Sequence, residues 1–504
     1  MQIKFVKIVF LLILFSLTAC KESWDEHYNS ISEVTVKQTV WELLLNDPDY
    51  SKFTDYLQAN GLDSLFKTGR SITVFVPDNA AFDNFNSDTS DVILILSYHI
   101  SETVFNTRNV EHSKMLETST GKFALIENNN GEYFVDGVKI YYSSPLCSNG
   151  KYYEIHDLLY PKPTLYEYIA HNSGILKDYI DQFDSVYLDH NLSTPLGYDS
   201  AGNTIYDSVF TYINLFDSLY FPVPQEFRQK TATFLLFDET QYRDALDEMA
   251  SNLTGNFHSF ADIPEVWQLN VLLPGIVKNG IFEGSFQYED FCAGKLKSIA
   301  GDTVFVDCNN IDPDSRFICS NGVVFKYLNF SVPDSLYKNE NKMQGESLVK
   351  AVGAGVFNWQ DWVKITGSNT TPVIQPVVGA DNDTIISLNL GIRYNGTFKM
   401  EFYIKNLFPQ KYRFVCRANS RPSGIYEIYV NDEYIGEIDL YDLRKTVRSV
   451  TGEFFIPDGG YNKFDFWVDN ITDFGDVKIA INYIESGASN TNGLAIDYVS
   501  LIPE

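Results

Sequence analysis

The chain has 504 residues, of which 44% are hydrophobic and 15% aromatic, and this is enough apolar material for about three folded domains. Its 66 acidic residues outnumber the 38 basic ones and give a formal net charge of −28. A field of this sign repels phosphate backbones, so the composition argues against nucleic-acid binding. A neutral glycan or a surface protein is the expected partner.

The first residues have the pattern of a secretory signal. Lys4 and Lys7 precede the apolar run Ile8 to Leu17, which is too short for an ordinary membrane span. The run leads into Leu17-Thr18-Ala19-Cys20, which resembles a bacterial lipobox. The alternative is an ordinary signal peptide with an incidental cysteine.

The lipobox resemblance implies how the protein is anchored. Residues 1–19 would be removed as a lipoprotein signal peptide, Cys20 would carry the lipid, and residues 20–36 would form a lipidated tether on the membrane. The acidic residues close behind Cys20 are similar to those of outer-membrane surface lipoproteins. We therefore expect an outer membrane lipoprotein at the cell surface, with the periplasmic face as the alternative.

Residues 37–163 combine predicted helices and strands. Apolar spacing indicates a helix near Val36 to Leu45 and a second helix over Tyr50 to Gln58. Ser71 to Val76 is a β-branched strand, and Pro77-Asp78-Asn79 then turns the chain into another helix. Short strands separated by Asn-Gly and Asp-Gly turns follow, at Phe123 to Ile126, Tyr133 to Val135, Lys139 to Tyr142 and Tyr152 to Ile155.

Three strings of this first region recur in the same order further along the chain. The strings beginning at Thr39, Ile72 and Cys147 return as those beginning at Thr164, Ala232 and Cys319, and the last string, Cys-Ser-Asn-Gly, is identical in both places. Such a repeat predicts a tandem duplication, with a divergent second module over residues 164–338. An insertion at residues 189–229 contains residue types that are typical of loops, around one aromatic run.

The residue composition and the spacing of apolar residues change after the second module. Residues 339–344 are polar and charged and are predicted to be a linker. Residues 345–504 contain short apolar runs broken by turn residues, which predicts an all-β sandwich of the jelly-roll type. The runs are Phe398 to Ile404, Lys411 to Ala418, Tyr426 to Val430, Lys463 to Val468 and Val477 to Ile481.

The string from Ile72 to Phe82, with Tyr98-His99 downstream and Asn149-Gly150 before a closing strand, resembles a fasciclin domain. The resemblance is close over residues 37–163 and loose over residues 164–338. It implies two α/β modules, each a wedge of sheet flanked by helices, used in cell adhesion and matrix contact. Pro77 and Asn79 match the turn of the family, where an Asn side chain can hold the start of the following helix.

Tyr98-His99 matches a dipeptide sometimes implicated in adhesion by this family, and both residues are adhesion candidates. The favoured alternative is a partly buried His99 that bonds to backbone or to the turn. The second module has Pro274-Gly275 at the corresponding place. Any binding role of the dipeptide therefore belongs to the first module.

The last strand, which contains Asp497-Tyr498-Val499, resembles that of galactose-binding-like sandwiches, many of which are carbohydrate-binding modules. Sugar rings stack on exposed aromatic side chains. The glycan-binding candidates in this domain are Trp359, Trp362, Tyr394 and Trp467. The alternative is core packing, which the alternation around Trp467 supports at least as well.

Five cysteines follow Cys20, and an odd number cannot pair completely within one chain. We expect most of them to be buried thiols. The alternative for two of them is a bridge between Cys308 and Cys319 inside the second module.

None of the usual catalytic or nucleotide-binding motifs is present, and neither a metal nor a cofactor is predicted. The predicted function is that of a non-catalytic envelope lipoprotein for adhesion or for binding a glycan or partner, accessory to a glycan-uptake system. A structural spacer without a saccharide ligand is the alternative. Carboxylate pairs that meet only in the fold leave a glycoside hydrolase as a remote alternative.

Overall fold

The computed structural model describes most of the chain. The described residues are 34–67, 69–87, 91–189, 191–221, 223, 231–367, 371–444, 447–448, 454–455, 461–488 and 491–504. The predicted signal peptide, the lipidation candidate Cys20 and most of the tether lie outside them. Among the described residues no helix is long and apolar enough to cross a membrane.

The chain divides into two compact units, and each unit contains segments that are distant in sequence. The first unit comprises Met1–Leu236 and Ile281–Lys326, and the second comprises Phe237–Gly280 and Tyr327–Glu504. Residues 164–338, predicted as one module, therefore contribute to both units.

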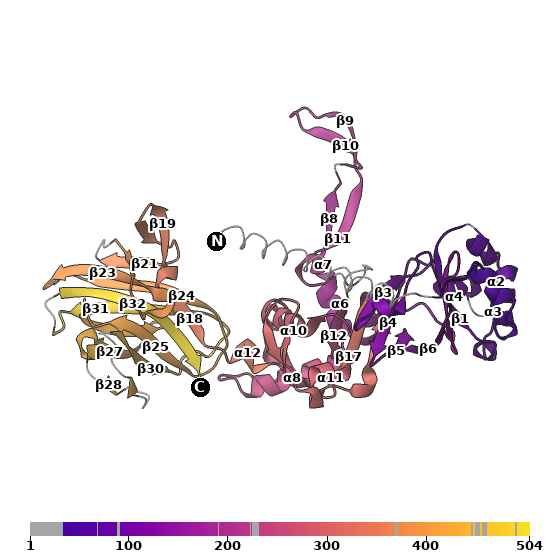
Figure 1. Ribbon diagram of the computed structural model, residues 1–504. Coiled ribbons are helices and arrows are strands. Elements are labelled where there is room, and N and C mark those ends of the chain that lie inside the picture. Colours follow the sequence, from indigo (N-terminus) through magenta and orange to yellow (C-terminus); the bar gives the residue numbers. More distant parts are fainter. Residues whose placement is uncertain are drawn as a thin grey trace, which may run out of the picture. The chain divides into compact units, whose positions relative to one another are not determined.

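The first unit contains a seven-stranded sheet with the order β2-β1-β7-β6-β5-β4-β3 (Figure 1). The second and third strands in this order, β1 and β7, run parallel, and the other neighbouring pairs are antiparallel. The strands are β1 (Ile72–Pro77), β2 (Ile100–Ser101), β3 (Ser113–Glu117), β4 (Phe123–Asn129), β5 (Glu132–Val135), β6 (Val138–Ser143) and β7 (Gly150–Ile155).

Apolar side chains cover both faces of the parallel pair, which explains why all six residues of β1 are buried. On one face, Val74 and Val76 pack with residues of α2 (Val40–Leu45) and α3 (Ser51–Ala59). On the other face, Phe75 packs with Tyr98 of α4 (Val92–Tyr98). The predicted strand and the helices on either side of it are therefore present in the fold.

The first unit also contains a four-stranded sheet with the order β13-β12-β17-β16. Its strands are β12 (Ala232–Leu236), β13 (Ile281–Glu283), β16 (Phe317–Cys319) and β17 (Gly322–Lys326). As in the first sheet, one neighbouring pair runs parallel, here β12 and β17, and β13, which follows β12 in sequence, pairs antiparallel with β12. The pairing thus repeats the core of the larger sheet.

The repeated strings make the same local contacts in both places. Thr39 and Thr164 each cap a helix through a reciprocal capping box with a Glu three residues later. Asn149 Oδ1 accepts from the Val40 N–H, and Asn321 Oδ1 accepts from the Leu165 N–H, at 2.8 Å in each case. The capped helices are α2 and α5 (Leu165–Asn172). Each Asn therefore joins the strand that closes its sheet to the first helix of its repeat.

The predicted insertion forms an arm of two β-hairpin segments (Figure 1). The base pairs β8 (Asp184–Leu188) with β11 (Phe210–Asn214), and the tip pairs β9 (Thr194–Tyr198) with β10 (Thr204–Asp207). Large apolar side chains along the arm are exposed, among them Tyr198, Tyr212, Leu196 and Phe210. The arm is thus an ordered element with an apolar surface.

The second unit joins a helical segment to the C-terminal β-structure. The helices are α8 (Glu239–Ser251), α9 (Glu265–Trp267), α10 (Leu273–Asn279) and α12 (Asp334–Tyr337). The Trp267 ring lies 5.1 Å from the Phe408 ring and 4.9 Å from the Phe474 ring. These aromatic contacts explain why residues 237–280 group with the sandwich.

The C-terminal region is a β-sandwich of two antiparallel sheets, which confirms the all-β prediction (Figure 1). One sheet has the order β22-β23-β32-β25-β30, with β18 also paired to β32, and the other has the order β21-β24-β31-β26-β27. The strands of the first sheet are β18 (Asn341–Gln344), β22 (Val373–Pro376), β23 (Thr384–Ile392), β25 (Tyr412–Asn419), β30 (Tyr461–Val468) and β32 (Thr491–Pro503). Those of the second are β21 (Lys364–Gly367), β24 (Phe398–Leu407), β26 (Ile425–Val430), β27 (Glu433–Asp439) and β31 (Gly475–Glu485).

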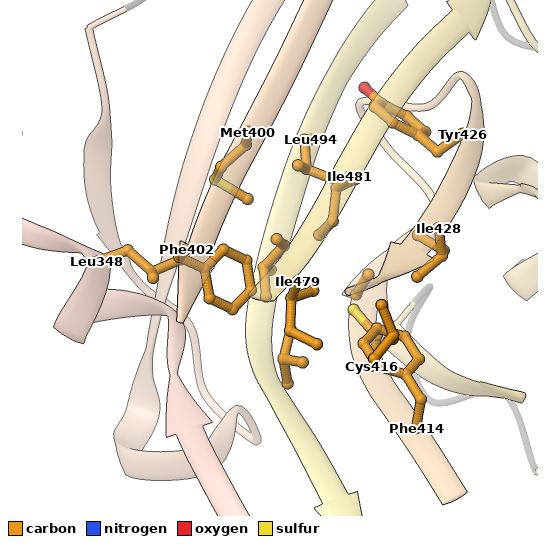
Figure 2. Packing of buried hydrophobic residues seen from close by; sticks show 14 of the residues in the cluster. Leu348, Met400, Phe402, Phe414, Cys416, Tyr426, Ile428, Ile479, Ile481 and Leu494 are labelled. Atoms are coloured by element: carbon orange, nitrogen blue, oxygen red, sulfur yellow. The ribbon is translucent and has the colours of Figure 1, made fainter. Parts of the chain in front are cut away.

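The core of the sandwich lies between the two sheets. Figure 2 shows Met400 and Phe402 of β24, Ile479 and Ile481 of β31 and Leu494 of β32 in this core. Alternate residues of each strand point inward, so the residues between them face outward. This alternation defines the outer faces of both sheets.

Two expectations from the sequence are corrected by the structure. Residues 339–344 are not simply a linker, because β18 pairs with β32 from Asn341↔Leu501 to Gln344↔Tyr498. Polar side chains do not prevent this pairing, since backbone groups make the hydrogen bonds of a sheet. Cys308 forms a disulfide with Cys292 and not with Cys319.

The position of Cys308 explains the disulfide. Cys292 follows directly after α11 (Tyr288–Phe291), and the Tyr288 hydroxyl donates a 3.0 Å hydrogen bond to the Cys308 carbonyl. The Cα atoms of the two cysteines lie 5.2 Å apart. Cys319 instead lies buried on β16, and Cys147 and Cys416 are also buried free thiols. Burial raises the pKa of all three thiols.

Candidate functional site

The outer face of the sheet β21-β24-β31-β26-β27 presents tyrosines among polar side chains. Tyr403 of β24 is 42% exposed and Tyr434 of β27 is 53% exposed, while Tyr429 of β26 is half-buried. The inward-facing neighbours Phe402, Ile404, Ile428 and Val430 belong to the core. We call this surface, with its polar residues Glu401, Glu427, Lys478 and Asn482, the tyrosine face.

The strand register places these side chains in neighbouring rows. Glu401, Ala480, Tyr429 and Tyr434 lie opposite one another on four adjacent strands. In the row on one side of it Asn482 lies opposite Glu427, and in the row on the other side Tyr403 lies opposite Lys478. Ala480 has a short side chain and is only 1% exposed, so the longer side chains around it cover it. The rows thus place tyrosine rings beside polar side chains on one face of the sheet.

Hydrogen bonds fix the polar groups on one side of this face. The Tyr429 hydroxyl donates to Glu427 Oε2 at 2.7 Å, and Asn482 Nδ2 lies 3.4 Å from the same oxygen. The bond to Glu427 raises the pKa of the Tyr429 phenol. The Tyr429 and Tyr434 rings lie 5.8 Å apart at 70°. Their edge-to-face packing holds both rings in place.

The Glu401 carboxylate lies close to three lysines of the tyrosine face. Lys399 Nζ lies 2.9 Å and Lys364 Nζ 3.4 Å from its carboxylate, while Lys478 Nζ lies 4.0 Å away. The hydrogen bond from Lys399 is the main reason that the pKa of Glu401 is lowered. The carboxylate is thus ionised and neutralised by neighbours. An uncharged ligand can bind this face without burying an unpaired charge.

None of the four predicted aromatic candidates is among the residues that define the tyrosine face, and three of them lie outside the strands of the two sandwich sheets. Trp359 ends β20 (Val356–Trp359) and is half-buried against the sandwich core, while Trp362 is 39% exposed just beyond it. Tyr394 packs against Tyr483 at 5.4 Å, and its hydroxyl donates to the Thr397 carbonyl. Among these three, Trp362 presents the most accessible ring.

Trp467 lies on the other sheet. It is half-buried on the outer side of β30, because Phe464, Phe466 and Val468 point into the core. Lys411 Nζ lies 4.2 Å from the centre of its ring, which is a cation–π contact. The four candidates therefore do not converge on one surface.

Tyr98 and His99 are both fully buried in the first module. The His99 Nε2 accepts from the Leu159 N–H at 3.0 Å, and Nδ1 lies 2.8 Å from the Ile95 carbonyl oxygen, to which it donates. Burial lowers the pKa of His99 to about 4, so the ring is neutral at pH 7. These contacts favour the structural alternative for His99.

Tyr98 belongs to a second buried network. Its hydroxyl lies 2.7 Å from Asp136 Oδ2 and 3.1 Å from the Phe123 carbonyl oxygen. Asp136 Oδ1 accepts from the Leu125 N–H, and burial raises the pKa of this carboxyl to about 6. Adhesion through the Tyr98-His99 dipeptide stays a prediction. Neither side chain is accessible to a partner in this fold.

Pro77 ends β1, and Asn79 follows it in the turn. We expected the Asn79 side chain to hold the start of the following helix, but it makes no capping hydrogen bond there. Its Nδ2 donates to the Pro48 carbonyl and its Oδ1 accepts from the Lys52 N–H, both at 2.8 Å. Asn79 therefore ties the turn to the start of α3, which lies earlier in the chain.

The tyrosine face could not be identified without the strand register. Lys399, Glu401 and Tyr403 alternate with Phe398, Met400 and Phe402, so the sequence does carry a period-two signal. A tyrosine in the polar phase of such a strand marks an outward aromatic. Among the described residues, no group of three or more His, Cys, Asp or Glu is arranged to hold a metal ion.

Comparisons with known proteins bear first on the N-terminal module. A family model for the fasciclin domain matches residues 48–161. Human periostin is 27% identical over 138 residues, which cover 25% of this chain and 16% of periostin. Fasciclin-1 of Drosophila melanogaster is 28% identical over 98 residues, or 19% of this chain and 14% of that protein. Residues 48–161 are a fasciclin domain, and the chain spans at most 16% of the length of these two relatives.

Solved structures with similarity to the chain include a carbohydrate binding module and a xanthan lyase. A family 35 carbohydrate binding module from Clostridium thermocellum is 12% identical with a TM-score of 0.21, covering 33% of this chain and 99% of that one. A Paenibacillus xanthan lyase is 17% identical with a TM-score of 0.24, covering 37% of this chain and 16% of that one. TM-scores this low assign neither a fold nor a ligand to the chain.

Proposed function

We propose that the protein is a non-catalytic binding protein of the bacterial outer membrane, which contacts a neutral glycan through its C-terminal sandwich. The tyrosine face is the observation that carries this proposal. Sugar rings present C–H faces that pack on aromatic rings, and their hydroxyls need polar partners nearby. Tyr403, Tyr429 and Tyr434 supply the rings, and Glu427 and Asn482 supply hydrogen-bonding groups.

The charge balance of the tyrosine face supports a neutral ligand. Glu401 is already surrounded by Lys399, Lys364 and Lys478. A phosphate or sulfate group would have to compete with Glu401 for these lysines, whereas hydroxyls can bond to the ion pairs without separating them. Neutral oligosaccharides are therefore the ligand class that this surface fits best.

In this proposal the N-terminal part of the chain is an anchor and a stalk. Cys20 would carry the lipid that holds the protein at the outer membrane, at the cell surface. The fasciclin domain and a divergent second fasciclin module would space the sandwich from the membrane and contribute adhesion. Matching capping boxes, strand pairing and Asn contacts in the two repeats support the second module. We also propose a role beside a glycan-uptake system.

A glycan array probed with the full chain tests the proposal. We expect binding to at least one neutral polysaccharide or oligosaccharide on a broad panel. A chain that binds none of them would favour the alternative of a structural spacer.

A second assay tests for hydrolysis. Incubation of a bound oligosaccharide with the protein should leave the length of the oligosaccharide unchanged. New reducing ends would instead favour the glycoside hydrolase alternative.

A further inference from the structure

The arm of the first unit has an open backbone edge along β11 (Phe210–Asn214), which the proposed function does not use. Among the described residues β11 pairs with β8 alone, in a two-stranded sheet. An isolated two-stranded hairpin is only marginally stable in water, and further strands stabilise it. The edge of β11 is therefore a place where an added strand would stabilise the arm.

The hydrogen bonds of the arm show which backbone groups of β11 point outward. The Asp189 N–H donates to the Val209 carbonyl, and the Leu215 N–H donates to the Phe183 carbonyl, both at 2.9 Å. The backbone groups of residues 209 and 215 therefore point toward β8. This direction alternates along an antiparallel strand. The outward N–H and C=O groups belong to the residues between them in the alternation, Phe210, Tyr212 and Asn214.

These three residues are complementary to a second copy of themselves. A two-fold axis at Tyr212 would pair two copies of β11 in antiparallel fashion, with Tyr212 opposite its own copy and Phe210 opposite Asn214. All three pairs are then of the hydrogen-bonded kind. Every outward N–H and C=O group of the three residues thus gains a partner from the same segment of the second copy.

The β11 edge lacks the features that usually prevent strands from pairing with other copies. Native edge strands are protected by charged residues, above all Lys, by Pro or by bulges. Residues 208–215 contain no charged residue and no Pro, and residues 178–227 contain no Lys or Arg. The pairing with β8 shows no register shift along β11. The β8 edge, by contrast, starts at Asp184 and is followed by Asp189.

Apolar side chains lie on one face of the arm beside this edge. Tyr212 is 80% exposed, Phe210 is 55% exposed, and Val186, which lies opposite Tyr212 on β8, is 52% exposed. Pairing about the axis brings the two Tyr212 rings next to each other, and aromatic pairs across strands stabilise a sheet. Four strands in the order β8-β11-β11-β8 would then share one apolar face.

The acidic residues at the ends of β8 oppose this pairing only weakly. In the four-stranded order the two copies of β8 lie three strand spacings apart, which is about 14 Å. This distance exceeds the Debye length of about 8 Å at physiological ionic strength. The net charge of −28 still repels a second copy of the chain at low salt. Added salt should therefore strengthen pairing with a second copy, whereas it would weaken pairing with a basic partner.

We propose that the β11 edge is a dimerisation surface, and that its partner is β11 of a second copy of this chain. The two arms form one continuous four-stranded sheet about a two-fold axis at Tyr212. The area of such a contact is small, so the dimer forms in a concentration-dependent way. The surface is separate from the tyrosine face of the sandwich and does not depend on glycan binding.

Sedimentation equilibrium of the full chain tests the proposal. We expect a dimer whose fraction rises with protein concentration and with added salt. Tyr212→Pro should weaken dimerisation at least tenfold, because it removes the N–H on the axis without removing a hydrogen bond to β8. Val186→Pro is the matched control, because it makes the same change at the residue directly opposite, on the β8 edge. This variant should dimerise as the native chain does.

A cross-linking measurement tests the axis without a proline in the strand. Residues of a hydrogen-bonded antiparallel pair have Cα atoms about 5.5 Å apart, and this separation suits a disulfide. Tyr212→Cys should therefore cross-link to its own copy under mild oxidation. Tyr198→Cys is the control, since Tyr198 is 76% exposed but lies on β9 at the tip of the arm. We expect much less cross-linking in the control.

Four results would overturn the proposal. One is a native chain that stays monomeric at every protein and salt concentration. Another is equal cross-linking of Tyr212→Cys and Tyr198→Cys, which would show random collisions. Loss of the dimer in Val186→Pro but not in Tyr212→Pro would assign the contact to the β8 edge. A dimer that dissociates as salt is added would contradict pairing through an uncharged edge.

Discussion

Glu127 and Arg316 form a largely buried ion pair across 189 residues of sequence. Arg316 Nη2 lies 2.5 Å from Glu127 Oε1, and Gln287 Nε2 donates to the same oxygen at 2.9 Å. Glu127 belongs to β4 of the fasciclin domain, whereas Arg316 directly precedes β16 of the four-stranded sheet. The pair therefore ties the two repeats together within the first compact unit.

We expect Arg316→Met to destabilise the first unit by about 3–5 kcal/mol, because it leaves the Glu127 carboxylate buried without its main partner. The double variant Glu127→Gln/Arg316→Met should be less destabilised than the sum of the two single changes. A double-mutant cycle from denaturant unfolding of the full chain measures this coupling. Additive effects would show that the contact does not hold the repeats together.

Gly150 should tolerate no side chain. A Cβ at this position would lie 1.8 Å from the Ile72 carbonyl oxygen of the parallel neighbour strand, and φ is +147°. Gly150→Ala should therefore lower the free energy of unfolding by about 1–3 kcal/mol. Gly174→Ala is the control, since a Cβ there meets nothing within 4 Å. Equal melting temperatures of the two variants would contradict the close approach of β1 and β7.

Two buried groups of the fasciclin domain should make opposing contributions to its pH dependence. The pKa of His99 is lowered from 6.5 to about 4, so the unfolded chain binds a proton that the folded chain does not between these values. Protonation of His99 therefore favours the unfolded chain, and the free energy of unfolding falls as the pH drops through that window. The pKa of Asp136 is raised from 3.8 to about 6, so its contribution is present at low pH and is lost as the pH rises.

Removal of one group should reveal the other. In Asp136→Asn, hydrogen-exchange protection around α4 and β7 should fall by about 3 kcal/mol between pH 6.5 and 4, after correction for intrinsic exchange. The wild type should change much less over the same range. A flat profile in Asp136→Asn would contradict the lowered pKa of His99.

The tip of the arm, residues 189–209, should be dispensable for the stability of the first unit. Its exposed side chains, such as Leu196 and Tyr198, pack against little else. Replacement of residues 189–209 by Asn-Gly, which closes β8 onto β11 with a favoured hairpin turn, should leave the melting temperature within about 2 °C, a change well below 1 kcal/mol. Binding of the dye ANS, which reports exposed apolar surface, should decrease. A large drop in melting temperature would show that the arm stabilises the fold.

Sequence alone predicts the elements that local patterns determine. The strand predicted at Ser71 to Val76 lies at Ile72–Pro77, and the helix predicted near Val36 to Leu45 lies at Val40–Leu45. The repeated Asn-Gly pairs likewise lie at the start of β7 and β17. These features depend on residues that are close in sequence or repeated. The all-β character of the C-terminal region follows from the spacing of its apolar runs in the same way. For these features the residue types themselves supply the physical cause.

The remaining features depend on contacts between distant residues. Cys308 pairs with Cys292 because α11 ends beside it, and spacing alone does not determine a disulfide partner. Asn79 bonds to residues near Pro48 and not to its own following turn. Tyr403, Tyr429 and Tyr434 share a face only through the register of four strands. Trp359 and Tyr394 pack partly against the core, where bulky aromatics contribute to stability.

The central claim is that the tyrosine face binds a neutral glycan, and calorimetry of the full chain tests it most directly. The ligand is a neutral oligosaccharide from the panel, and the variant is Tyr403→Ala/Tyr434→Ala. Tyr212→Ala on the arm is the control, because it also removes one highly exposed tyrosine. We predict at least tenfold weaker binding by the double variant, a loss of about 1.4 kcal/mol, and unchanged binding by the control. Equal affinity in all three chains would contradict the tyrosine face as the site.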